Sequence, residues 1–293
     1  MEARGEGIAP QTQKLPGGIE RTVVEIQDQA AAKRLGREVG TYVTLSCAQE
    51  AMADLPARRV LADALSKDLS RLLPEGAKRV LVVGLGNRHV TPDALGPRTV
   101  ERVLVTRHLS AVLGGEFASL ASVCAAAPGV LGVTGMETAE IVLGMAQHVR
   151  PDAVIAIDAL AARSAARIGT TIQIADTGVA PGSGVGNHRR ALNRETLGVP
   201  VIAVGVPMVV YAAVIAADAL SAFARADGAS PEDEDALIAF AKRAIGETLG
   251  EMIVTPREID ALIDRMAGII AEGINRALHP DLSPSDVAQL MAT

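Results

Sequence analysis

Short apolar runs rich in β-branched residues alternate along the chain with longer stretches that repeat apolar residues every three or four positions. The short runs predict buried strands, and the longer stretches predict amphipathic helices. The predicted strands cover residues 19–26, 41–46, 80–83, 152–160, 171–176 and 201–204. The predicted helices cover residues 58–73, 97–109, 138–148, 233–249 and 256–278, with another from about Met208. This alternation predicts an α/β fold in which a mainly parallel sheet carries helices on both faces.

No linker divides the 293 residues, so we expect a single α/β domain over residues 1–293. Residues 1–18 are polar and contain Gly and Pro, which indicates a loose amino-terminal segment, and residues 208–293 are mostly helical. An uncharged run over residues 197–217 has the length of a membrane span. Two prolines and a glycine interrupt that run, so we predict a strand, a turn and a helix there, and no membrane contact.

The composition is that of a soluble globular protein, with 49% hydrophobic and 21% charged residues. A formal net charge of −6, three Phe, two Tyr and no Trp argue against binding to nucleic acid, which needs a basic surface and stacking side chains. Cys47 and Cys124 form no CxxC pair, so we expect free buried thiols and no zinc or redox motif.

Two aspartates follow apolar strands in matching places. Asp93 lies in the glycine-rich segment 84–97, where Pro92 and a Gly-Pro pair stiffen the backbone, and Asp158 falls at the far end of the strand over 152–160. Ligands of open α/β sheets bind at the carboxyl ends of strands, and an aspartate there is costly to bury unless it is paired or used. On neighbouring strands the two carboxyls would face each other, and one would keep a proton. Such a pair can act as general base and general acid in a hydrolysis. Helix capping is the alternative role for either residue.

Four further residues are candidates for substrate binding or support. Asn87 follows Gly84-Leu85-Gly86, Asp176 ends a predicted strand, and Glu137 begins a predicted helix in a segment that we expect to line the cleft. His188 lies in a glycine-rich loop, where it could order a carboxylate, bind a metal or donate to an oxyanion, or simply face solvent. The third glycine of a dinucleotide fingerprint would fall at His89, so we expect no nucleotide cofactor.

Several long blocks resemble the germination protease family of spore-forming bacteria. They follow in order along residues 84–97, 127–140, 152–160, 173–189, 252–260 and 273–280. The resemblance implies an endopeptidase that degrades small acid-soluble spore proteins during germination, in the cytoplasm of the spore core. It implies an atypical aspartic mechanism without a cofactor, in which Asp93 and Asp158 are the catalytic pair. It also implies a homotetramer and a zymogen; since the chain starts about where the processed enzyme begins, we expect it to be active without processing.

Two other functions stay open on the sequence alone. The hydrogenase-maturation proteases are similar in having a GxGN loop, two strand-end acids and a histidine, which implies a related architecture. In that reading Asp93, Asp158 and His188 would bind nickel or zinc. Alternatively the chain is a non-catalytic binding homologue, because Met208 and Tyr211 stand where the family pattern has Thr and Asp.

Overall fold

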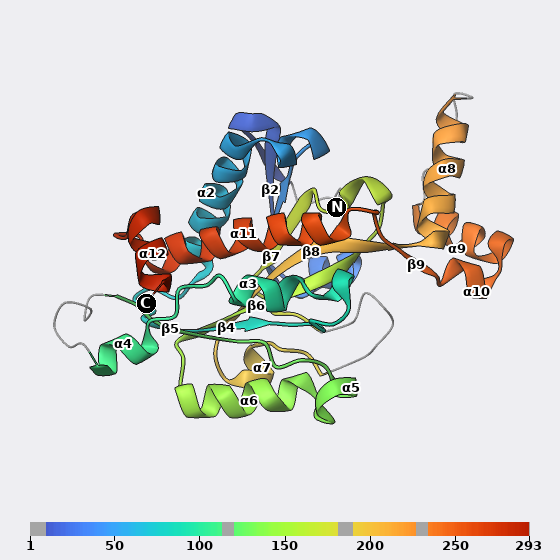
Figure 1. The fold of residues 1–293 in the computed structure, drawn as a ribbon. Coiled ribbons are helices and arrows are strands. Elements are labelled where there is room, and N and C mark those ends of the chain that lie inside the picture. The colour runs from blue at the N-terminus through green and yellow to red at the C-terminus, as the bar shows by residue number, and fades with distance from the viewer. Residues whose placement is uncertain (1–9, 113–119, 181–189, 227–233, 293) are drawn as a thin grey trace.

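One mixed sheet of nine strands runs through residues 10–112, 120–180, 190–226 and 234–292, which the computed structural model describes (Figure 1). Its strand order is β1-β2-β3-β7-β8-β6-β4-β5, and β9 pairs with β8. The strands are β1 (Gln11–Leu15), β2 (Ile19–Ile26), β3 (Gly40–Ser46), β4 (Arg79–Gly84), β5 (Ser122–Ala126), β6 (Ala153–Ala162), β7 (Thr171–Ala175), β8 (Val201–Tyr211) and β9 (Ile253–Val254).

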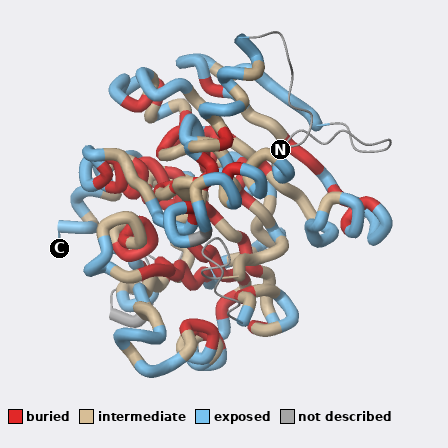
Figure 2. Tube along the Cα trace, turned by 90° about the vertical axis from the view of Figure 1, so that its right-hand side faces the viewer, coloured by how far each residue is buried: buried red, intermediate tan, exposed pale blue. Residues whose placement is uncertain are grey.

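Helices pack on both faces of this sheet, as the alternating sequence pattern predicts (Figure 1). They are α1 (Gln29–Leu35), α2 (Leu55–Leu72), α3 (Leu95–Val100), α4 (Arg107–Val112), α5 (Leu131–Thr134), α6 (Thr138–Val149), α7 (Arg194–Leu197), α8 (Ala212–Ala226), α9 (Glu234–Ile245), α10 (Glu247–Gly250), α11 (Ile259–Leu278) and α12 (Pro284–Met291). The larger hydrophobic core lies between the sheet and α2, α3 and α11, and a smaller core lies under α6 and α7. Buried positions therefore run through the middle of the molecule, with exposed positions around them (Figure 2). The α/β class is confirmed.

The two halves of the sheet differ in strand direction. β5, β4, β6 and β8 are parallel neighbours, whereas β1, β2, β3 and β7 pair antiparallel with one another and with β8. The parallel half carries the two aspartates. The antiparallel half is joined to α2 by a buried ion pair, in which Arg21 Nε donates to both carboxylate oxygens of Asp68 at 3.0 and 2.9 Å.

Several of the elements predicted from the sequence are corrected by the structure. The segment 11–15, expected to be loose, pairs with β2 as the edge strand β1, while residues 1–9 lie outside the described residues. The predicted turn is absent, because a bulge opposite Leu160 accommodates Pro207 within β8, and the helix predicted from about Met208 begins at Ala212 as α8. The predicted helix over 97–109 is two short helices, α3 and α4.

β6 and β8 extend beyond the ends of β4 and β5, and α8, α9 and α10 gather at the far end of β8 (Figure 1). The predicted helix over 233–249 is divided there at Gly246, whose φ of 82° ends α9. No helix of the described chain is both long and apolar enough to cross a membrane.

Candidate active site

The loop after β4 closes on itself through contacts between glycines. A Cβ on Gly84 would lie 2.2 Å from the carbonyl oxygen of Gly96, and a Cβ on Gly96 would lie 2.3 Å from the carbonyl oxygen of Leu85. Neither contact leaves room for a side chain. The beginning of the loop and the beginning of α3 therefore lie backbone against backbone, and the residues between them form a narrow closed turn.

Asp93 lies on the returning side of this closed loop, against Gly86 and Asn87. It ends a 3-10 turn, η3 (Thr91–Asp93), and its N–H donates to the carbonyl oxygen of Val90 at 2.8 Å. Its carboxylate Oδ2 accepts the backbone N–H of Asn87 at 2.7 Å. Gly86 has a φ of 110°, and a Cβ there would lie 2.0 Å from the carbonyl oxygen of Asp93. These contacts are the ones that a stiff loop presenting one carboxylate would need, and the Asp93 side chain is half-buried.

Asp158 lies on the strand next to β4, at the level where the loop begins. Gly84 pairs with Ile157, and the N–H of Leu85 donates to the carbonyl oxygen of Ile157 at 2.8 Å. Asp158 follows directly and is only 6% exposed. The turn η3 contacts both β6 and β8, so the turn that carries Asp93 rests against the strand that carries Asp158.

The sequence analysis predicted Asp158 at the far end of its strand, and this position is corrected: Asp158 lies inside β6. β6 continues to Ala162 because β8 extends beside it, and Asp158 pairs with Gly205 of that strand. A Cβ on Gly205 would lie 2.5 Å from the side chain of Leu160. β4, in contrast, ends at Gly84, which pairs with Ile157, so the loop that carries Asp93 begins one residue before the level of Asp158.

The other predicted residues have separate positions. Asn87 belongs to the Asp93 loop: its N–H binds Asp93, and its Oδ1 accepts the N–H of His89 at 3.0 Å. Glu137 begins α6 and donates its N–H to the carboxylate of Glu140 at 3.2 Å, which is the capping role. His188 lies outside the described residues.

The structure does not bring Asp176 to the two acids. β7 runs antiparallel to β8, so its carboxyl end points toward the opposite edge of the sheet. With Ala175 level with Ala203 and Asp158 level with Gly205, Asp176 lies about 10 Å farther along the strands and about 10 Å across them. Its Oδ1 accepts the N–H of Thr41 at 2.8 Å and so helps to join β7 to β3.

A positioning residue absent from the sequence predictions is Asn275, which is buried on α11. Its Oδ1 accepts the N–H of Leu104 at 2.8 Å, and its Nδ2 donates to the carbonyl oxygen of Arg102 at 3.1 Å. These bonds fix the segment between α3 and α4, on which β5 then docks. The only sequence signal for it is an amide side chain inside the apolar stripe of a helix.

Chemically, the arrangement offers the half-buried carboxyl of Asp93, on the loop after β4, and the buried carboxyl of Asp158, on the neighbouring strand β6. Within the part of the chain that the structure describes, no group of three or more His, Cys, Asp or Glu side chains could hold a metal ion. Cys47 and Cys124 are partly exposed free thiols, and burial raises the pKa of both, which disfavours the reactive thiolate.

Comparison with known proteins identifies the family. The family model described as germination protease matches residues 3–238 and 226–290. The germination protease of Clostridium acetobutylicum is 40% identical over 96% of this chain and 91% of that protein. That of Caldanaerobacter subterraneus subsp. tengcongensis is 43% identical over 94% of this chain and 89% of that protein. That of Bacillus velezensis is 40% identical over 91% and 85%, respectively.

Among solved structures, the [NiFe] hydrogenase maturation protease HycI of Thermococcus kodakarensis is similar at 20% identity, with a TM-score of 0.37. The similarity covers 71% of this chain and 98% of that one. The sequence matches are far stronger, extend over nearly the whole chain and include both strand–loop units that carry the aspartates. The chain therefore belongs to the germination protease family, whose members are peptidases of bacterial spores.

Proposed function

We propose that this protein is an atypical aspartic endopeptidase that hydrolyses small acid-soluble spore proteins in the spore core during germination, with Asp93 and Asp158 as its catalytic pair. The observation that carries the proposal is the placement of η3 against β6. This contact lays the turn that ends in Asp93, an acid held by a backbone N–H, against the strand that carries the buried Asp158.

In the proposed mechanism one carboxylate activates a water molecule for attack on the peptide carbonyl. The other, protonated, donates to the carbonyl oxygen or to the leaving nitrogen. Two carboxyls that share a site titrate as a pair, so the proposal assigns the roles of base and acid to the pair and not to either aspartate. The closed glycine loop supports this chemistry because it fixes the Asp93 carboxylate before substrate arrives.

The proposal includes no cofactor, no bound nucleic acid and no membrane partner, and it takes the active particle to be a homotetramer. Sedimentation of the purified chain at micromolar concentration measures the last point, and a monomer alone would contradict it. Of the two residues at which the family pattern differs, Met208 is fully buried, whereas Tyr211 is half-buried and packs against a small cluster with Val210 and Val214.

The direct test compares Asp93→Asn and Asp158→Asn with the wild-type protein on a purified small acid-soluble spore protein. The amide keeps the volume of each side chain but cannot act as a base or share the proton. We expect each variant to lose at least about 100-fold in kcat/KM while its melting temperature stays near the wild-type value. Asp281→Asn, at an exposed position outside the loop, is the matched control and should keep full activity.

Either aspartate variant with near-normal activity and normal melting would remove that residue from the mechanism. The same assay with a chelator tests the metal-dependent alternative. Cleavage that is abolished by the chelator and restored by nickel or zinc would replace the two-aspartate mechanism with a metal-assisted one. No cleavage by folded wild-type protein would favour the non-catalytic reading.

A further inference from the structure

The strand β5 is the outermost strand of the parallel half, and its backbone groups alternate between two sides. Ser122 pairs with Arg79, and its N–H donates to the carbonyl oxygen of Lys78 at 2.6 Å, so Ser122, Cys124 and Ala126 bond toward β4. The residues between them face outward. No other strand of the described chain pairs with this outer side.

Thr106 occupies the first outward position of β5. The N–H of Val123 donates to Thr106 Oγ1 at 2.9 Å, and the N–H of Thr106 donates to the carbonyl oxygen of Val123 at 3.0 Å. Two residues farther along, the N–H and C=O of Ala125 are the next outward pair, and none of the described residues bonds to them. Among the residues that the structure describes, the edge is thus paired at its beginning and unpaired toward its carboxyl end.

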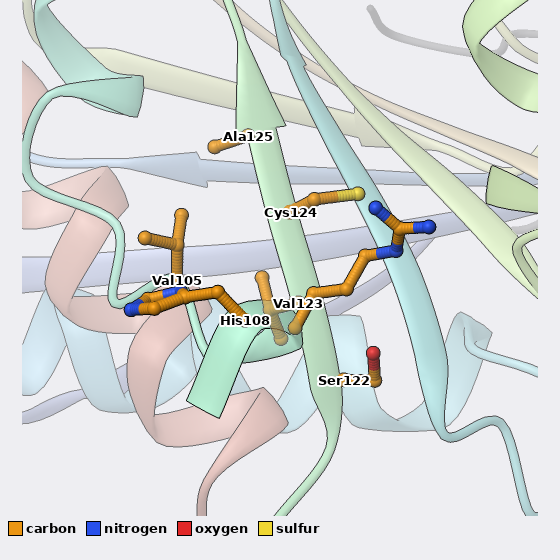
Figure 3. A pocket seen from close by; sticks show the side chains of 7 residues that line it. Val105, His108, Ser122, Val123, Cys124 and Ala125 are labelled. Carbon is orange, nitrogen blue, oxygen red and sulfur yellow. The ribbon is translucent and has the colours of Figure 1, made fainter. Parts of the chain in front are cut away.

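A hollow of about 610 Å³ lies beside β5, from the part that Thr106 closes to Ala125 (Figure 3). It is lined by residues 122–125 of β5 and by Val105, Arg107 and His108. Successive side chains of a strand point to opposite faces, as Cys124 and Ala125 do in Figure 3. A hollow that touches four successive residues must therefore run along the edge of the strand and not over one face of the sheet.

The open edge ends at the level of the candidate active site. Ala126 pairs with Val83, one residue before the loop that carries Asp93 begins at Gly84. The next residues, Ala127, Pro128 and Gly129, are small and add no bulky side chain at this end of the strand. A chain lying outside β5 would be three strand spacings, or about 14 Å, from β6, which an extended chain spans in about four residues.

We propose that the outer edge of β5 binds an extended stretch of the protein substrate as an added strand, at residues about four or more positions away from the bond that is cut. This inference rests on the proposed peptidase function. It commits to main-chain recognition: the outward N–H and C=O of Ala125 bond to the substrate backbone, and the hollow holds the added strand and its flanking side chains. Since these bonds involve only the substrate backbone, the site selects substrates that are extended and long enough to reach β5, whatever their side chains.

The test uses Ala125→Pro, which removes the outward N–H and leaves the bonds of Ser122, Cys124 and Ala126 to β4 in place. We expect KM for a small acid-soluble spore protein to rise about three- to tenfold with kcat unchanged. Cleavage of a short peptide that spans only the cut bond should not change. Ala125→Ser keeps the N–H and is the comparison variant, so its KM for the spore protein should stay clearly below that of Ala125→Pro.

A second measurement does not depend on the proline variant. In the Asp93→Asn protein, amide hydrogen exchange at Ala125 and Ala127 should slow when the spore protein is added, and should be fast without it. Equal KM values for Ala125→Pro and Ala125→Ser, or the same exchange at Ala125 with and without substrate, would overturn the added-strand site. Those results leave cleavage by the wild-type protein intact, whereas a wild-type protein that does not cleave would remove the proposed function itself.

Discussion

At the scale of the residue, a single methyl group at position 96 should open the Asp93 loop. A Cβ there would lie 2.3 Å from the carbonyl oxygen of Leu85 and 2.5 Å from its nitrogen, both of which are backbone atoms that cannot turn aside. We expect Gly96→Ala to lower the free energy of unfolding by about 1–3 kcal/mol. We also expect it to reduce kcat/KM more than tenfold, since an active-site carboxylate displaced by about 1 Å loses its alignment.

Gly144→Ala is the control for that prediction, because Gly144 is also helical and nothing lies within 4 Å of its added Cβ. It should raise the free energy of unfolding by up to about 1 kcal/mol and leave kcat/KM unchanged. Denaturant unfolding and cleavage assays on both variants measure the difference. Similar behaviour of the two would mean that the contact between Gly84 and Gly96 does not fix the loop.

The sequence predicted the chemistry of this loop better than its internal contacts. Proline and glycine around Asp93 indicate a stiff loop, because both residue types restrict or specify the backbone locally. The bond from Asn87 N–H to Asp93 and the approach of Gly96 to Gly84 join positions 6 and 12 residues apart in sequence. Such contacts depend on how the loop closes in space, and a pattern of residue types does not contain that information.

At the scale of the element, Asn275 of α11 should contribute strongly to the stability of the fold, because its one side chain bonds two backbone groups of another segment. Asn275→Ala would leave the N–H of Leu104 and the carbonyl oxygen of Arg102 buried without partners. We expect it to lower the free energy of unfolding by about 2–4 kcal/mol, which urea unfolding measures.

Asn275→Asp separates the two bonds, since the carboxylate keeps the acceptor for Leu104 and loses the donor to Arg102. It should restore part of the stability only if the Leu104 bond contributes independently. An Asn275→Ala protein as stable as the wild type would show that the segment between α3 and α4 is held by other contacts, such as those of Thr106 with β5.

The errors in predicting elements have a common cause in tertiary contacts. Residues 97–109 have a helical pattern, but the chain leaves α3 to bond with Asn275 and then with β5. Pro207 indicates a turn by itself, yet β8 continues through it because the bulge opposite Leu160 absorbs the missing donor. By contrast, the helices over 58–73 and 256–278 agree with α2 and α11, whose apolar stripes are long enough to specify a helix without help.

At the scale of the whole molecule, His279 should make stability depend on pH. Its imidazole is 2% exposed, neither ring nitrogen has a hydrogen-bond partner in the described chain, and burial lowers its pKa below the ordinary 6.5. Below about pH 6.5, His279 is therefore protonated in the unfolded chain but stays neutral in the folded chain until the pH reaches its lower folded pKa. The free energy of unfolding should fall as pH drops from about 7 toward the folded pKa, by up to about 1.4 kcal/mol per pH unit from this group.

Thermal unfolding between pH 5 and 8 measures this dependence, and His279→Leu should flatten it. His148, exposed on α6, supplies the control: His148→Gln should leave the slope as it is in the wild type. A His279→Leu protein with the wild-type slope would assign the dependence to other groups.

The long stretch of sequence between β3 and its partner β7 delays the assembly of the sheet during synthesis. β3 pairs on one side with β2 and on the other with β7, and Ser46 meets Thr171, which is 125 residues later in the sequence. On a ribosome that adds about 5–20 residues per second, β1, β2 and β3 wait about 6–25 s for the strand that joins them to the rest of the sheet. Throughout that interval the free side of β3 is an unpaired strand edge, and a nascent chain in this state offers chaperones, or a neighbouring nascent chain, a place to bind.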